Sequence, residues 1–190
     1  GSGGLALGFE KAGLKCLFAN DIDRDSCETL KKNRPKWNIL HKDIHKISDV
    51  EFKKLKGADV VSGGFPCQAF SYAGKKLGFK DTRGTLFYEF ARAVKIIKPR
   101  ICLAENVRGL ISHDGGKTLK TIINIMEEIG YKVIAPQVCQ SIFYEVPQKR
   151  ERLFLIGIKK GSGLKFNYPN KISEPYTVKD ALKKGRLYKT

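Results

Sequence analysis

The chain has 190 residues, 42% of them hydrophobic, which is enough for one domain with a sizeable core. Its 36 Lys and Arg residues against 19 Asp and Glu give a net charge of +17, which favours a polyanionic partner, nucleic acid first, over a basic surface that only aids solubility. No apolar run is long enough to cross a bilayer and no secretory signal is visible, so we expect neither a membrane protein nor an exported one.

The five cysteines are widely spaced and form no Cys-x-x-Cys pair. No histidine lies near them in the sequence, so we expect no metal site. An odd number of cysteines in a chain with no export signal favours reduced thiols and a cytoplasmic location.

The chain opens on a glycine-rich loop, Gly1-Ser2-Gly3-Gly4. Glycines allow a tight turn and a close approach of a cofactor to the backbone at a helix N-terminus. A short helix follows and stops at Gly13. Because such a loop normally follows a β-strand, we expect a first strand to precede Gly1. The string also fits the G-x-G-x-x-A fingerprint of nicotinamide-dependent oxidoreductases.

Two predicted strands each end in an Asp-Ile pair. The first covers 15–20 and runs into Asp21-Ile22, and the second covers 38–42 and runs into Asp43-Ile44, with a helix at 24–33 between them. Acids at strand tips are placed to accept hydrogen bonds from a nucleoside, and the isoleucines can pack against its ring. The alternative is that these acids cap helices, and for Asp43 the two readings are equal.

A short β-branched run at 58–62 reads as a buried parallel strand, and it ends in Gly63-Gly64 followed by Phe65-Pro66-Cys67. The strand would present the Cys67 thiol at the carboxyl edge of the sheet, where ligands bind in open α/β folds. Alone, the cysteine reads more readily as a small buried hydrophobe, and the residues around it reverse that preference. The polar loop at 72–82 and the adjoining Arg83 could close as a lid on a polyanion, or be an ordinary solvated loop.

The second half repeats the strand and helix alternation. We predict helices at 86–97 and 119–129, and strands at 100–104, 131–138 and 153–158, with Pro136 marking an edge or bulge. Glu105 follows a buried strand, where burial would raise its pKa and suit it to donate a proton, although it could equally cap a helix or form a salt bridge. Arg150 and Arg152 alternate onto one face and suit a phosphate or a base carbonyl, unless they pair with Glu145 or Glu151.

This order predicts an α/β fold with a doubly wound, mostly parallel sheet whose last strand is antiparallel. From Lys159 onward, eight lysines and one arginine face two acids, with scattered glycines and prolines. We therefore expect a catalytic domain over 1–160 and a basic linker over 161–190, with a helix at 177–184.

Five short strings together resemble the DNA cytosine-5 methyltransferase family, each in the expected order and at the expected strand end. They span the chain from Gly1 to about Lys184. The strings are Gly1-x-Gly3-Gly4, Gly64-Phe65-Pro66-Cys67-Gln68, Asp81-Thr82-Arg83-Gly84-Thr85-Leu86-Phe87, Glu105-Asn106-Val107 and Gln148-x-Arg150-x-Arg152.

The resemblance implies an S-adenosylmethionine-binding, Rossmann-like catalytic domain that methylates C5 of a flipped-out cytosine in double-stranded DNA. It implies Cys67 as the nucleophile at C6 and Glu105 as the acid at N3, with Arg150 and Arg152 on the base carbonyl and phosphate. The implied cofactor residues are Gly1, Ser2, Gly3, Gly4, Asp21, Ile22, Asp43, Ile44, Pro66 and Leu86. The implied DNA-contacting residues are Gln68, Ser71, Lys75, Arg83 and Gln148.

The family's target-recognition region and last two motifs are not found in these residues, and Glu145 stands where the family usually has glycine. We therefore expect the catalytic core of a larger or split enzyme, with a second polypeptide possible as partner. It would be a bacterial restriction-modification or orphan modification enzyme, cytoplasmic and nucleoid-associated. Alternatives are a non-catalytic DNA-binding fragment, a relative that acts on RNA and, more remotely, an NAD-dependent oxidoreductase.

Overall fold

The computed structural model describes residues 1–66 and 85–183, and its elements alternate as the sequence predicts. The strands are β1 (Ala19–Asp21), β2 (Ile39–His41), β3 (Val60–Gly63), β4 (Ile101–Val107), β5 (Tyr131–Val133), β6 (Gln137–Gln140) and β7 (Glu151–Lys159). The α-helices are α1 (Gly4–Lys11), α2 (Arg24–Asn33), α3 (Asp49–Lys53), α4 (Leu86–Ile97), α5 (Lys117–Glu128) and α6 (Val178–Lys183). Short 3-10 helices are η1 (Ile44–Lys46), η3 (Arg108–Ile111), η4 (His113–Gly116) and η5 (Ser141–Phe143).

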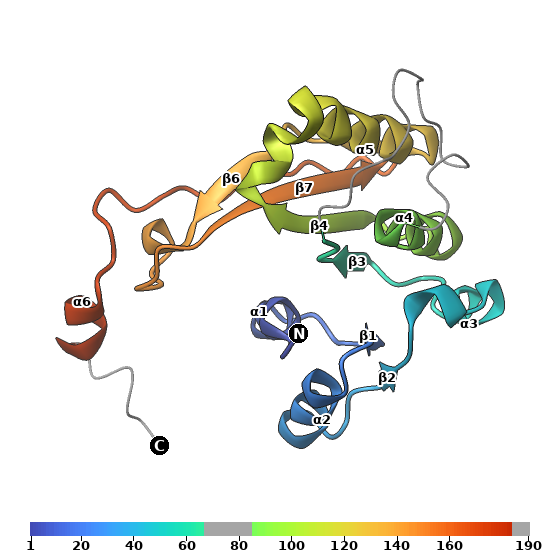
Figure 1. The fold of residues 1–190 in the computed structure, drawn as a ribbon, viewed down its shortest axis with the longest axis horizontal. Helices are drawn as coiled ribbons and strands as arrows, with labels where there is room; N and C mark the ends of the chain where they lie inside the picture. The colour runs from blue at the N-terminus through green and yellow to red at the C-terminus, as the bar shows by residue number, and fades with distance from the viewer. Residues whose placement is uncertain (67–84, 184–190) are drawn as a thin grey trace.

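The strands form a mostly parallel arrangement with one reversed member (Figure 1). β3 pairs in parallel with β4, and β7 pairs antiparallel with β4, β5 and β6. β3, β4, β5 and β6 therefore share one direction, and β7 runs against them. β1 and β2 form a separate parallel pair. The predicted fold class, including the antiparallel last strand, is confirmed.

The two faces of β4 serve different purposes because side chains alternate along a strand. Cys102, Ala104 and Asn106 are buried, and the first two belong to the apolar cluster that contains α4 and α5 residues. Leu103 and Glu105 point to the opposite face, which borders a large cavity on the side of α1. β7 repeats this division, because Leu153 and Leu155 join the same cluster while Arg152 and Phe154 border the cavity.

Most predicted elements are confirmed, and two helices match residue for residue, at 24–33 and 86–97. The single strand predicted at 131–138 is wrong: β5 and β6 are separate strands that pair with different parts of β7. Pro136 lies in the break between them, where a residue without an N–H costs no ladder hydrogen bond. The predicted burial of the 58–62 strand is also wrong, since Val61 is half-buried and Ser62 exposed at the cavity edge.

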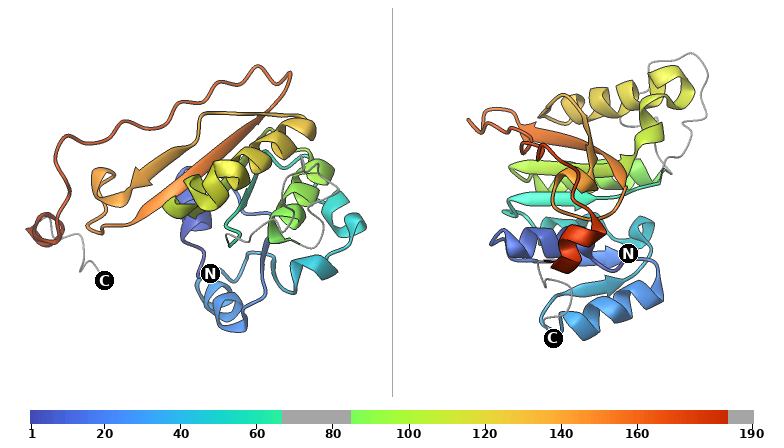
Figure 2. Two further views of the ribbon diagram at one scale, coloured as in Figure 1. Left: turned by 45° about the horizontal axis from the view of Figure 1, so that its top comes forward. Right: turned by 90° about the vertical axis from the view of Figure 1, so that its left-hand side faces the viewer.

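The segment after β7 runs extended towards α6 (Figure 2). It does not hang free, since the Ile172 and Tyr176 amides donate to the carbonyl oxygens of Phe143 and Ile142 at 3.0 and 2.8 Å. The Tyr168 hydroxyl also donates to the Phe154 carbonyl oxygen at 2.9 Å. A domain boundary at residue 160 stays a prediction.

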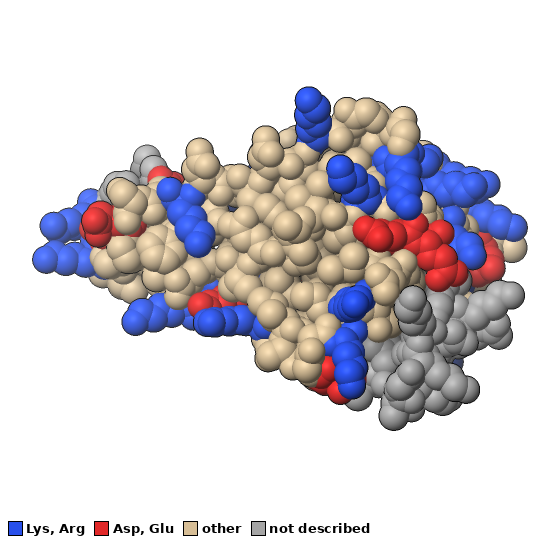
Figure 3. Space-filling model, turned by 90° about the horizontal axis from the view of Figure 1, so that it is seen from above, with Lys and Arg blue, Asp and Glu red and all other residues tan. Residues whose placement is uncertain are grey.

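The positive charge is spread rather than gathered on the face seen in Figure 3, where Lys and Arg side chains surround a largely uncharged centre. The described residues on that face therefore form no single basic stripe for a polyanion. Among the described residues, no helix combines the length and apolar character needed to cross a membrane.

Gly63, the last residue of β3, lies against the ring of Phe90 on α4. A Cβ added there would sit 2.7 Å from the Phe90 Cδ2 atom, closer than carbon atoms can pack. We expect Gly63→Ala to lower the free energy of unfolding by about 1–3 kcal/mol, because the ring must shift in a packed core. Urea denaturation measures the change.

Gly109→Ala is the matched control, since a Cβ at that position meets nothing within 4 Å. Its stability should change by less than about 0.5 kcal/mol. Equal effects of the two alanines would contradict tight packing between β3 and α4.

Candidate active site

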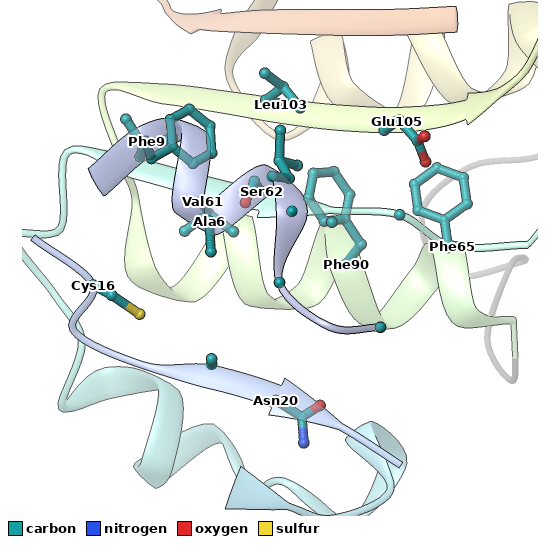
Figure 4. A pocket seen from close by; sticks show the side chains of 18 of the residues that line it. Ala6, Phe9, Cys16, Asn20, Val61, Ser62, Phe65, Phe90, Leu103 and Glu105 are labelled. Atoms are coloured by element: carbon teal, nitrogen blue, oxygen red, sulfur yellow. The ribbon is translucent and has the colours of Figure 1, made fainter. Parts of the chain in front are cut away.

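A cavity of about 1860 Å³ lies between the β1–β2 pair and the face of β3, β4 and β7 that is turned towards α1. Figure 4 shows Ala6 and Phe9 of α1 near Val61 and Leu103, with Asn20 of β1 across the space. Glu105 and Phe65 lie together near one end of the view. The cavity thus reaches from the glycine loop to the end of β3, where Cys67 follows in the sequence.

One end of the cavity gathers the glycine loop and the tip of β1. Gly1, Ser2, Gly3 and Gly4 line it together with Asp21 and Ile22. Gly3 has a φ of 85°, a left-handed conformation that favours glycine, and it leads directly into α1. The structure therefore brings an exposed apolar residue, an acid and a helix N-terminus together.

Asp43 and Ile44 line the same cavity after β2. The Asp43 carboxylate accepts hydrogen bonds from the His45 ring at 2.8 Å and the His45 amide at 3.0 Å. These bonds, the ring first, lower the pKa of Asp43. Asp43 is therefore the N-cap of η1, as one of the two readings predicted, and it also borders the cavity, so capping does not remove it from the site.

Glu105 and two arginines form the charged cluster of the cavity. The Arg152 Nε atom lies 2.9 Å from Glu105 Oε1, and Arg150 Nη2 lies 3.7 Å from the same oxygen. Glu105 and Arg152 are diagonal neighbours on one face of the β4–β7 ladder, because Glu105 is paired with Phe154 and Arg152 with Val107. Glu151, one of the two surface acids considered as partners for these arginines, binds Arg108 at 3.1 Å.

The second oxygen of Glu105 faces the end of β3. A Cβ added to Gly64 would lie 3.1 Å from Glu105 Oε2, so the bare backbone of Gly64 makes room for the carboxylate. The arginines hold Oε1, and Oε2 is directed towards the residues that lead into Cys67. The arrangement fixes the orientation of the carboxyl group from two sides.

Asn106 holds the same backbone from the other face of β4, a role that our sequence analysis missed. Its side-chain nitrogen donates to the Phe65 carbonyl oxygen at 2.8 Å, and its side-chain oxygen accepts from the Val107 amide at 2.9 Å. The side chain is 4% exposed. The sequence did hold a signal for this role. Asn106 is a polar residue on the same face of the strand as Cys102 and Ala104, where an apolar residue would be expected.

Several predicted site residues lie outside the described residues, namely Cys67, Gln68, Ser71, Lys75 and Arg83. Pro66 and Leu86, which flank that segment, both line the cavity. Gln148 is exposed on the loop before β7. In that loop Glu145 takes a left-handed φ of 59°, the conformation for which glycine is better suited.

The surroundings of Cys102 and Cys16 disfavour the thiolate form that a nucleophile needs. Cys102 is 2% exposed, and burial raises its pKa to about 12. Burial also raises the pKa of the half-buried Cys16. Within residues 1–66 and 85–183, no three His, Cys, Asp or Glu side chains gather as a metal site would require.

The residues that line the cavity are suited to a cofactor that contains a nucleoside. Asp21 presents a carboxylate, and Ile22 is an apolar side chain that is 67% exposed beside it. An exposed isoleucine is suited to cover a ring, and the start of α1 offers backbone N–H groups. The residues present therefore fit S-adenosylmethionine.

Comparison with known proteins identifies the family that this sequence resembles. The model of the C-5 cytosine-specific DNA methylase family matches residues 1–188. The chain is 56% identical to the type II methyltransferase M.Eco47II of Escherichia coli over 99% of its length, and 52% identical to M.PspPI of Psychrobacter over 99%. It spans 45% of each of these two relatives, less than half of their length.

Solved structures share the fold. A candidate DNA modification methyltransferase encoded within an E. coli prophage matches 96% of the chain with a TM-score of 0.76 and 30% identity, and the match covers 52% of that protein. Spodoptera frugiperda DNMT2 matches 90% of the chain with a TM-score of 0.70 at 23% identity, which concerns the fold alone. Because the family model matches nearly the whole sequence, the chain belongs to the C-5 cytosine-specific DNA methylase family.

Proposed function

We propose that the full-length protein methylates C5 of a cytosine in double-stranded DNA with S-adenosylmethionine as methyl donor. The observation that carries this proposal is the junction of Glu105 with Arg152, Arg150 and the Gly64 backbone at the end of the cavity. It sets a carboxyl group with a defined orientation against Gly64, which stands three residues before Cys67 in the sequence. The names of the relatives as type II methyltransferases support a place in restriction and modification.

The chemistry explains why these groups are needed together. Cytosine C5 is a poor nucleophile until the Cys67 thiolate adds to C6 and directs electron density to C5. As the new C6–S bond forms, N3 gains negative charge and takes a proton from a neighbouring acid. The bound cofactor supplies an electrophilic methyl group. Loss of the C5 proton to a base and return of the N3 proton to the acid then expel the thiolate and leave 5-methylcytosine.

The described residues take definite parts in this scheme. Glu105 is the proton donor at N3, through the Oε2 atom that faces Gly64, while Arg152 keeps Oε1 in place. Arg150, whose side chain is half exposed, is free enough to reach a phosphate or the base carbonyl and to favour the Cys67 thiolate. Asp21 accepts from the ribose hydroxyls, and Ile22 and Ile44 cover the adenine. Pro66 and Leu86 line the methyl end.

Contacts to DNA complete the proposal. Gln68, Ser71, Lys75 and Arg83 would contact the DNA once the target base has left the duplex, and the exposed Gln148 would join them. Reading of the sequence would need segments beyond these 190 residues, on the same or a second polypeptide. A cytoplasmic, nucleoid-associated location follows from a DNA substrate and stays a prediction.

Cys67→Ser in the full-length protein should reduce methyl transfer by about 10³-fold or more, because a serine hydroxyl is not ionised near neutral pH and cannot add to C6. Binding of S-adenosylhomocysteine should change by less than about twofold, since the thiol contacts the base rather than the cofactor. Transfer of labelled methyl groups to DNA and isothermal calorimetry measure the two effects.

Cys139→Ser on β6 is the control and should keep full activity. Loss of cofactor binding in Cys67→Ser would show a structural thiol and would contradict the assigned role. Binding of NAD instead of S-adenosylhomocysteine by the unmutated protein would favour the oxidoreductase alternative.

Asn106→Ala should lower kcat by about tenfold, because the Phe65 carbonyl loses its buried donor and the turn before Cys67 is no longer fixed. The affinity for S-adenosylhomocysteine should stay within about twofold, since Asn106 lies on the face of β4 away from the cavity. Single-turnover methylation at saturating cofactor separates the two quantities.

Asn124→Ala on the exposed side of α5 is the matched control. If Asn106→Ala lowered stability yet left kcat unchanged, the side chain would serve packing only. The positioning role would then be rejected.

A further inference from the structure

A partly buried ion cluster centred on α4 lies just outside the cavity and is not part of the charged site described above. Its centre is Arg92, whose side chain is 14% exposed. The Arg92 Nε atom donates to Glu89 Oε2 at 2.7 Å, and Nη1 donates to Asp49 Oδ1 at 2.6 Å. The guanidinium carbon also lies 4.8 Å from the centre of the Phe52 ring. Glu89 is only 5% exposed, so its carboxylate depends on this partner.

The third nitrogen of the guanidinium, Nη2, lies 2.5 Å from Glu89 Oε2 and also binds backbone. Arg92 Nη2 donates to the Ile47 carbonyl oxygen at 2.8 Å and to the Ile44 carbonyl oxygen at 3.3 Å. Ile44 is the first residue of η1 and Ile47 follows its last residue. Arg92 therefore fastens both ends of a one-turn helix that is 45–48 residues away in the sequence.

This short helix matters because its start borders the cavity. Asp43, Ile44 and His45 all line it, and Asp43 already caps η1 from within. A single turn of 3-10 helix has few hydrogen bonds of its own, so external donors decide where it sits. The cavity lining does not include Arg92, so the arginine can act on a bound molecule only through its neighbours, of which η1 receives two of its hydrogen bonds.

The same helix α4 carries Leu86 and Phe90, which line the cavity directly. Arg92 therefore joins the element that forms one part of the cavity wall to the turn that forms another. Burial alone would lower the pKa of Arg92, but the hydrogen bonds to Glu89 and Asp49 raise it. The link is therefore a permanent charge, and it remains in place over the whole physiological pH range.

We infer that Arg92 is a positioning residue for the nucleoside end of the cofactor, acting through the Asp43–Ile44 turn. This inference rests on the proposed function. A lysine cannot replace the arginine here, because an ammonium group is a compact point charge and cannot reach two carboxylates and two carbonyl oxygens in different directions.

Arg92→Lys in the full-length protein tests the inference. We expect the Kd for S-adenosylhomocysteine and the Kd for adenosine to rise together by about tenfold, as for the loss of one charge-assisted hydrogen bond. The KM for DNA and the kcat at saturating cofactor should stay within about twofold. Hydrogen exchange of the Ile47 amide, which donates to the Ile44 carbonyl, should become faster, while that of the amides of α4 stays the same.

Arg100→Lys is the matched control, because Arg100 forms an exposed pair with Asp59 at 3.6 Å, and its cofactor affinity should not change. Asp49→Asn changes an exposed partner of Arg92, and it should raise the Kd for S-adenosylhomocysteine by a smaller factor than Arg92→Lys does. If Arg92→Lys bound both ligands as the unmutated protein does, or if kcat fell with unchanged Kd, the inference would be overturned. Failure of the unmutated protein to bind S-adenosylhomocysteine would instead overturn the proposed function.

Discussion

The antiparallel ladder between β4 and β7 decides where Glu105 and Arg152, two charged residues of the candidate site, lie. Seven residue pairs, from Ile101 with Ile158 to Val107 with Arg152, fix the register. Because side chains alternate, this register places Glu105 and Arg152 on the cavity face as diagonal neighbours. A slip of one residue would turn one partner towards α4 and α5 and leave a charge inside the apolar core. Burial of Cys102, Ala104, Leu153 and Leu155 on that side makes such a slip costly.

The end of β3 depends on the same strand from both sides. On the cavity face, Glu105 Oε2 lies where a side chain at position 64 would crowd it. On the core face, the Asn106 amide holds the Phe65 carbonyl, and the Phe65 ring packs against Phe87 and Phe90 of α4. Two consecutive residues of β4 thus act on the end of β3: Glu105 supplies the acid, and Asn106 holds the backbone that leads to Cys67. Preorganisation of this kind is what a proton transfer and a nucleophilic addition at one base require.

The sequence predicted the fold well where local signals were strong. Thr85 and Asp23 are N-caps that start α4 and α2 at the predicted residues. Glu105 could be expected at a strand end, and Arg150 and Arg152 could be expected on one face. Their meeting on a single carboxylate could not, because it depends on the register of β4 with β7, which lie about 45 positions apart in the sequence.

Other features could not be predicted from short stretches of sequence, because they too depend on contacts between distant residues. The contacts of Arg92 join residues more than 40 positions apart, and helix periodicity predicts only that Arg92 is on α4. The split of the 131–138 strand follows from β7 being long enough to pair with two short strands in turn. The roles of Asp21 and Asp43 were predicted from their positions at strand tips. That Asp43 both caps η1 and borders the cavity could be seen only in the structure.

The most direct measurement is a covalent trap of the full-length protein on duplex DNA that carries 5-fluorocytosine at the target base. After methyl transfer the fluorine at C5 cannot leave as a proton, so the thiolate cannot be expelled. The account predicts a complex that forms only with S-adenosylmethionine, survives denaturant and high salt, and maps by mass spectrometry to Cys67. A complex that dissociates in salt, as ionic DNA binding does, or an adduct on another residue would contradict it.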